Sequence, residues 1–373
     1  MPEYRKNFSG ELLIKPKSVS NWIDYSSNLV NGSISAQFDN SRGMTVNIID
    51  PDKELASSFE IGYDVKLKLG FDDLPDNYIF NGFIGTNGLD DTESGYSLQC
   101  YDFVNQAVTE NVYLTKPDEP YKNIYGNIVY RKGYDGWECY NVVQDLFDSL
   151  YGAPLTVGGK GTNPMKKIRT EDSFYGMGTK KSFADKALAL CTDTDLNTNP
   201  YPLAYHYFQT NSSSESTLNF IKEKDLDSAT PEYYFDDRSF MLNSNLVRNI
   251  DQYTSARVKD TDIYYKPASA RATYGEKCIL LDKKYESYDN NYQMAVDLVE
   301  RLRFPRTSFE ILVFDGLDIE LGNIVEIQSD IKPSIKGTYM VHGINYEFND
   351  SSVTTKLSLN NKATNLKDVI QLK

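Results

Sequence analysis

One octapeptide pattern occurs twice in this chain, as Glu60-Ile61-Gly62-Tyr63-Asp64-Val65-Lys66-Leu67 and as Glu320-Leu321-Gly322-Asn323-Ile324-Val325-Glu326-Ile327. Both copies follow the order glutamate, apolar residue, glycine, two variable residues, valine, one variable residue, and then a final apolar residue. After the valine the residues alternate, as in a strand with one buried face. Self-similarity of this kind indicates that a structural unit is present more than once.

The similarity continues beyond the octapeptides. A second strand passes through glycine in each copy, at Ile79–Ile84 and at Ser334–Tyr339, and a third alternating strand follows, around Leu98 and Leu357. One interpretation is that any two β domains share such patterns. The interpretation that we favour is two copies of one β domain, so that residues 5–107 and 245–360 superpose. The residues that define the repeat are Gly62, Val65, Gly82, Gly322, Val325 and Gly337.

The N-terminal part, residues 1–108, is β-like throughout. Alternating or short apolar runs occur at intervals of about ten residues. Glycine and aspartate lie between them, as in Asp50-Pro51-Asp52, where turn chemistry ends a strand. This spacing predicts a sandwich or a barrel.

Residues 109–244 have a different character. Val142, Leu146 and Leu150 lie on one face of a predicted helix, and Phe183 and Leu188 lie on one face of another. We expect these two faces to form a local core. The region is therefore predicted to be a mixed α+β insertion.

β-like sequence returns in residues 245–373, interrupted by one predicted helix over residues 292–303 that Pro305 ends. The whole chain is therefore predicted to be mainly β, with two β-barrel domains on either side of the α+β insertion. The expected domains are residues 1–108, 109–244 and 245–373.

Composition excludes several classes of protein. The net charge of -14 disfavours a protein that binds nucleic acid by neutralising phosphates. No apolar run is long enough for a transmembrane helix, and no secretory signal is visible at the N-terminus, so neither is expected. The four cysteines are far apart in sequence, without the close pairs of zinc or redox sites.

The sequence contains short stretches that resemble phosphate-binding, calcium-binding or catalytic motifs, but none of them fits its motif. The Gly158-Gly159-Lys160-Gly161 stretch resembles a phosphate loop but has Pro154 in place of the first glycine. Asp72-Asp73 and Asp90-Asp91 fit solvated hairpin turns better than calcium or catalytic sites. The only histidines, His206 and His342, lie in apolar strands and are interpreted as structural. We therefore expect no catalytic, cofactor-binding or metal-ligating residues, and no enzyme activity.

The order of these patterns resembles the central hub proteins of phage tail baseplates, the late control protein D family. The similarity is carried by Gly62–Leu67 with Phe80-Asn81-Gly82, by Leu321–Ile327 with Gly337–Val341, and by Thr354–Leu359. It covers both ends of the chain, whereas the middle matches only in placement. The resemblance implies two barrels like the tail-tube subunit, so that a trimer presents six barrels in a ring.

The function implied is that of a non-catalytic trimeric adaptor between a six-fold tail tube and a three-fold spike or tail tip. Its expected partners are further copies of itself, the tube protein, the spike or tip protein and other baseplate proteins, with DNA only in transit. The expected location is the virion tail, after assembly in the host cytoplasm. Alternatives are the hub of a phage-like injection machine, and a cell-wall hydrolase or receptor-binding protein of the tail tip.

Overall fold

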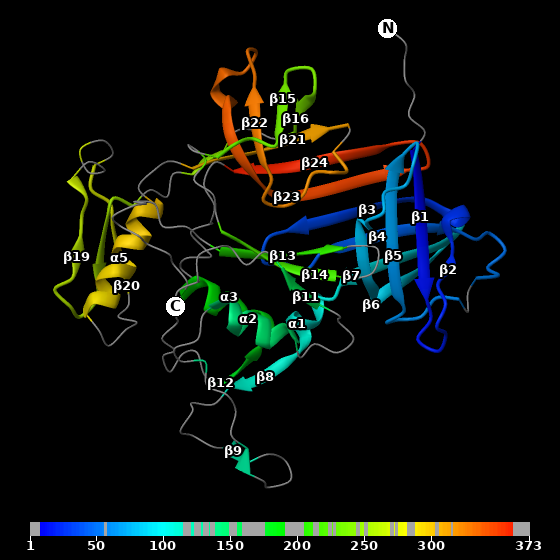
Figure 1. The fold of residues 1–373 in the computed structure, drawn as a ribbon, viewed down its shortest axis with the longest axis horizontal. Coiled ribbons are helices and arrows are strands. Elements are labelled where there is room, and N and C mark those ends of the chain that lie inside the picture. Colours follow the sequence, from blue (N-terminus) through cyan, green and yellow to red (C-terminus); the bar gives the residue numbers. More distant parts are fainter. Residues whose placement is uncertain are drawn as a thin grey trace.

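The computed structural model has a mainly β fold, as the sequence predicts (Figure 1). It describes residues 8–55, 58–114, 121–122, 128–129, 134, 139–148, 155–158, 176–190, 205–211, 216–222, 226, 229–243, 247–249, 253–268, 272, 275–281, 288–302, 306–314 and 316–360. Among these residues, no helix is both long enough and apolar enough to cross a membrane.

The N-terminal β unit consists of strands that were largely visible as alternating sequence. In β5, for example, Val65, Leu67 and Leu69 are buried while the residues between them are only partly covered. The elements are β1 (Phe8–Lys15), β2 (Ile23–Asp24), the 3-10 turn η1 (Ser26–Asn28), β3 (Leu29–Gln37), β4 (Gly43–Ile49), β5 (Asp64–Phe71), β6 (Phe80–Thr92) and β7 (Gly95–Asp102).

The middle region has its own core. Val142 and Leu146 of α2 pack with Phe183 and Leu188 of α3, which confirms the predicted local core; Leu150 lies outside the described residues. The elements are α1 (Asn105–Thr109), β8 (Asn111–Leu114), β9 (Tyr121–Lys122), β10 (Ile128–Val129), α2 (Cys139–Asp148), β11 (Leu155–Gly158), β12 (Gly176–Thr179), α3 (Lys180–Leu190), β13 (Tyr205–Asn211) and β14 (Ser216–Lys222).

The C-terminal β unit starts at residue 233. The expected boundary at residue 244 falls between β16 and β17, and both of these strands pair with β21. The elements of this unit are β15 (Tyr233–Asp236), β16 (Phe240–Leu242), β17 (Val247–Asn249), β21 (Arg306–Val313), β22 (Ile324–Gln328), η3 (Pro333–Ile335), β23 (Gly337–Asn349) and β24 (Val353–Asn360).

A small module is inserted between β17 and β21. It contains β18 (Ser255–Val258), β19 (Tyr264–Tyr265), β20 (Cys278–Leu281) and α5 (Tyr288–Leu302), the helix predicted from the sequence. Ala295, Leu298 and Val299 of α5 pack on the three-stranded sheet in a separate core. Figure 1 shows this module standing to one side of the large sheet.

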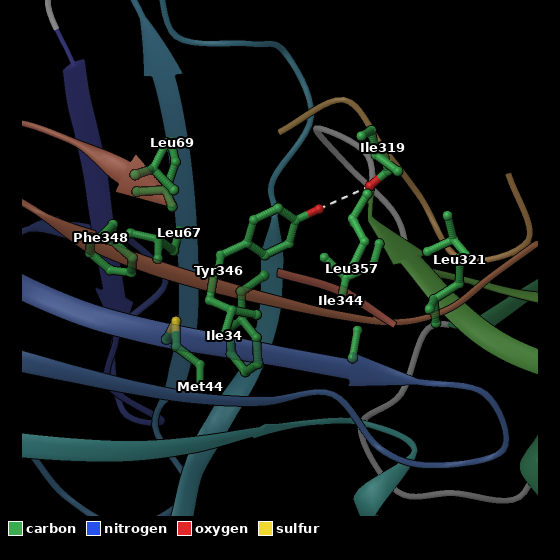
Figure 2. Close-up of a cluster of buried hydrophobic side chains, with 14 of the residues drawn as sticks. Ile34, Met44, Leu67, Leu69, Ile319, Leu321, Ile344, Tyr346, Phe348 and Leu357 are labelled. Carbon is green, nitrogen blue, oxygen red and sulfur yellow. Dashed lines mark hydrogen bonds between the residues drawn. The ribbon is translucent and has the colours of Figure 1, made fainter. Parts of the chain in front are cut away.

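The two β units are joined in one sheet. Its strands follow the order β16-β21-β24-β23-β3-β4-β7-β6-β5-β1-β2, with β17, β22 and β15 attached beside this path. The joint is the antiparallel pairing of β3 with β23. Side chains from both units meet in a single core, where Ile34 and Met44 lie beside Tyr346 and Phe348 (Figure 2).

Candidate functional site

The turn before β5 forms a specific hydrogen-bonded unit. Gly62 has a φ of 84°, which L side chains rarely adopt, so glycine is favoured there. Its N–H donates to the carbonyl of Ile84 at 2.8 Å, and the N–H of Ile84 donates to the carbonyl of Tyr63 at 2.9 Å. The turn therefore fixes where β6 stops pairing with β5.

The turn before β22 repeats this arrangement. Gly322 has a φ of 83°. Its N–H donates to the carbonyl of Val341 at 2.9 Å, and the N–H of Val341 donates to the carbonyl of Asn323 at 3.0 Å. Gly322 and Val341 therefore occupy the places that Gly62 and Ile84 hold in the first turn.

The valines and the later glycines behave differently. Val65 and Val325 are both fully buried, three residues after their turn glycines. Gly82, however, lies opposite Val65, whereas Tyr339 lies opposite Val325. Gly337 is two residues away from the position equivalent to Gly82. The sequence patterns concealed this offset because the two hairpins differ in length.

The pairing pattern extends the equivalence to whole units. The N-terminal unit has the spatial order β1-β5-β6-β7-β4-β3, and the C-terminal unit has the order β15-β22-β23-β24-β21, followed by β16 and β17. The strands also succeed one another along the chain in the same sequence. One difference is direction, since β1 is antiparallel to β5 while β15 is parallel to β22.

The joint between the units uses the second half of β23. The pairing of β23 with β22 ends at Met340, and residues 343–349 then pair with residues 37–31 of β3. Between these two parts, the register of β23 against β24 shifts between Val341 and Gly343. The Tyr346 hydroxyl donates to the Ile319 carbonyl at 2.9 Å (Figure 2). Burial raises the pKa of this tyrosine, so that it stays a neutral donor. The joint is a buried, sheet-continuing interface.

A second junction connects the middle region to both units. Asp39, in the turn after β3, has its carboxylate 2.7 Å from Nδ1 of His206 and accepts the N–H of Tyr207 at 2.9 Å. Phe38 stacks on the His206 ring, with centroids 4.7 Å apart, and meets the edge of His342 at 5.1 Å. The two histidines of the chain therefore lie together where three regions meet, which the sequence did not reveal.

Partly exposed carboxylates support these junctions. The Tyr207 hydroxyl donates to the Asp39 carbonyl at 3.1 Å and lies 3.2 Å from the Asp185 carboxylate, which pairs with Lys181. Burial raises the pKa of Asp185 to about 6, against the opposing effect of Lys181. At neutral pH this arrangement holds a structural ion pair under the junction.

Asp102 caps the end of β7. Its carboxylate accepts the N–H of Arg42 at 2.9 Å, and its own N–H donates to the Arg42 carbonyl at 3.0 Å. Complete burial raises the pKa of Asp102 to about 7. The group thus titrates near neutral pH and ties the β3–β4 turn to β7.

The paired aspartates and the start of the glycine-rich stretch singled out in the sequence lie in or beside ordinary strands and turns. Asp72 lies in the turn after β5, with a φ of 65°. Asp90 and Asp91 lie on β6 itself rather than in the hairpin turn, because the strand runs to Thr92. Residues 159–161 of the glycine-rich stretch lie outside the described residues. Among the side chains that the structure describes, no group of three or more potential ligands could hold a metal ion.

Solved structures share this arrangement over almost the whole chain. A tail protein from Neisseria meningitidis MC58 superposes with a TM-score of 0.58 at 10% identity, over 95% of this chain and 96% of the other. The prophage tail protein gp18 from Listeria monocytogenes EGD-e gives a TM-score of 0.57 at 10% identity, over 97% of each chain. The chain has the fold of phage tail proteins.

This tail-protein fold also occurs outside phages. The E. coli c3393 protein, described as a component of the type VI secretion system similar in structure to the T4 tail proteins gp27 and gp5, superposes with a TM-score of 0.50 at 9% identity. The match covers 95% of this chain and 77% of that one. No protein-family model and no curated protein matches the sequence. The tail-protein fold is thus retained where sequence similarity is nearly lost.

Proposed function

We propose that this chain is a structural hub of a phage tail: a trimer that joins the six-fold tail tube to the three-fold spike or tail tip and lines the channel for DNA. The observation that carries the proposal is the duplication, two units of one strand order fused in a continuous sheet. Three such chains offer six similar positions to a six-fold partner while keeping three-fold symmetry. Closed symmetry of this kind is common among oligomers.

The role needs no catalysis, and the chain is proposed to have none. His206 and Asp39 form the kind of pair that can serve general-base chemistry. Here the imidazole is buried against Phe38 and the carboxylate also holds the backbone of Tyr207, so both groups serve the junction between regions. Turnover of peptidoglycan by the purified chain, abolished in His206→Ala, would instead favour a cell-wall hydrolase of the tail tip.

The proposal is tested by assembling the chain with its tube and spike proteins. The purified protein is mixed with the tube and spike proteins encoded beside it, and the mass of each complex is measured in solution. We expect three copies in every complex, and six similar densities in averaged electron micrographs viewed down the axis. A chain that neither protein captures, and that stays monomeric at high concentration, contradicts the proposal.

A second candidate is the hub of a phage-like injection machine, which the similarity to the E. coli secretion component favours. The same trimer would then deliver proteins instead of DNA. Deleting the gene in the producing cell separates the two functions. Loss of plaque formation supports the phage hub, and loss of target-cell killing without loss of phage supports the injection machine.

A further inference from the structure

The internal joint has two complementary halves, and each half has an equivalent elsewhere in the same chain. One half is the outer edge of β3, and the other is the second half of β23. The strand orders make β17 equivalent to part of β3, and make β6 equivalent to β23. Within the described part of the chain, β17 pairs only with β21, and the second half of β6 pairs only with β7.

The register of β6 can be matched residue by residue to β23. Ile84 faces Cys100 and Val341 faces Leu359, next to the equivalent turns. Two residues back along β7 and β24, Leu98 faces Leu89 and Leu357 faces Ile344. Leu89 is therefore the equivalent of Ile344, and Asp90 is the equivalent of Asn345.

The register of β17 can be matched to β3 in the same way. Ser35 of β3 faces Gly43, and Val247 of β17 faces Ser308. Gly43 faces Tyr101 on β7, and Ser308 faces Asn360 on β24, so the two positions correspond. Val247 is therefore the equivalent of Ser35, and Arg248 is the equivalent of Ala36.

Exposure separates the occupied edge from the open one. Ile344, beside β3, is 3% exposed, whereas Leu89 is 36% exposed and its neighbours Asp90 and Asp91 are also exposed. An open strand edge presents unpaired N–H and C=O groups that can pair with another chain. Charged residues such as these aspartates are a common means of keeping an edge from pairing with the wrong partner.

We propose that the open edge of β6 accepts β17 from a second copy of this chain, in the register of the internal joint. This inference rests on the hub proposal and names the contact that holds its copies together. Asn345 pairs with Ser35 and Ile344 with Ala36 inside one chain. Between chains, Asp90 then pairs with Val247 and Leu89 with Arg248.

The contact is head-to-tail, because β6 belongs to the N-terminal unit and β17 to the C-terminal unit, so that the two copies contribute different edges. Contacts of this type generate a closed ring when the rotation returns on itself, and an open filament when it does not. The internal joint relates the N-terminal unit to the C-terminal unit of one chain, and the proposed contact relates the C-terminal unit to the N-terminal unit of the next. Every unit then has the same kind of neighbour on both sides.

Disulfide trapping tests the register. Single variants Asp90→Cys and Val247→Cys are made with exposed Cys278 changed to serine, then mixed and oxidised under conditions of assembly. Directly opposite residues place their Cβ atoms about 4.5–5.5 Å apart, near disulfide distance. We expect a linked pair only in the mixture. The matched control, Asp90→Cys with Arg248→Cys, is one residue out of register and should link about ten-fold less.

The double variant Asp90→Cys/Val247→Cys reports the closure of the ring. We expect bands for two and three linked chains on a denaturing gel, and none above three. Leu89→Cys with Arg248→Cys is a second in-register pair, should a Val247 variant not fold. Far-ultraviolet circular dichroism identifies any variant that fails to fold.

The outcomes separate this inference from the hub proposal. Trimers that form without in-register linking overturn the strand pairing but leave the hub function standing. Linked trimers that no tube or spike protein captures support the pairing and contradict the hub. Equal linking in the in-register and out-of-register pairs also overturns the pairing.

Discussion

The two β units share a strand order, yet the same edge is covered in one unit and open in the other. In the C-terminal unit, Ile344 and Tyr346 are buried where β3 adds to β23. In the N-terminal unit, the equivalent positions on β6 hold Leu89 and Asp91, which are exposed. Residue type at a repeated position therefore follows whether a strand of the same chain covers that edge.

The largest expected difference comes from placing a charge on each edge. Ile344→Asp buries a carboxylate without a partner, so we expect it to lower the free energy of unfolding by at least about 3 kcal/mol. Leu89→Asp, on the open edge, should cost less than about 0.5 kcal/mol. Chemical denaturation of the isolated chain measures both. Equal costs would show that the edge of β6 is covered within the monomer.

Truncating equivalent core leucines comes next. Leu98 and Leu357 are both fully buried in the shared core, and each substitution to alanine should cost about 2–5 kcal/mol. Because one core serves both units, both variants should shift the same unfolding transition in calorimetry. Leu146→Ala, in the separate core of the middle region, should cost a similar amount. A transition that only one of the two core variants moves would show that the units unfold independently.

Substituting the two turn glycines with alanine should lower the stability of the fold by a smaller amount, and the two losses should differ. An alanine at either position adopts a strained left-handed φ, at a cost of about 1–2 kcal/mol. At Gly322, an added Cβ would also lie 2.3 Å from Cδ1 of Ile221, whereas at Gly62 it would meet the mobile end of Lys17. The melting temperature of Gly322→Ala should therefore be lower than that of Gly62→Ala. A lower melting temperature for Gly62→Ala would mean that Ile221 of β14 moves aside at little cost.

A further effect is expected from pH. The folded-state pKa of Asp102, about 7, lies above the value near 3.8 of an exposed aspartate. The folded chain then holds a proton that the unfolded chain has released, so this contribution is full below pH 4 and is lost as the pH rises through 7. Melting temperatures of the wild type should fall across this range more steeply than those of Asp102→Asn. Parallel curves would assign the pH dependence to other groups.

Local features of the fold could be predicted from the sequence. The alternation in Asp64–Leu69 placed β5, and the apolar face around Leu298 placed α5, because side-chain period reports one buried face. The equivalence of Gly62 and Gly322 was visible for a similar reason, since a left-handed turn strongly favours glycine.

Long-range features could not be predicted. The pairing of β3 with β23 joins residues far apart in sequence, and no local pattern marks which strand a free edge will meet. The offset between Gly82 and Gly337 was hidden by hairpins of unequal length. The meeting of Asp39 with His206 was also invisible, although each histidine was correctly placed in a strand.

The β3–β23 joint also means that β3 is synthesised long before the strand that pairs with it. Gln37 leaves the ribosome early, but its partner Gly343 follows roughly 300 residues later. At about 5–20 residues per second, β3 would wait roughly 15–60 seconds for its neighbour. During that interval a nascent chain carries an unprotected strand, and neighbouring ribosomes on one message carry the same strand. Faster translation or a bound chaperone would shorten or shield this exposure, so the yield of folded protein should depend on growth temperature more than its final stability suggests.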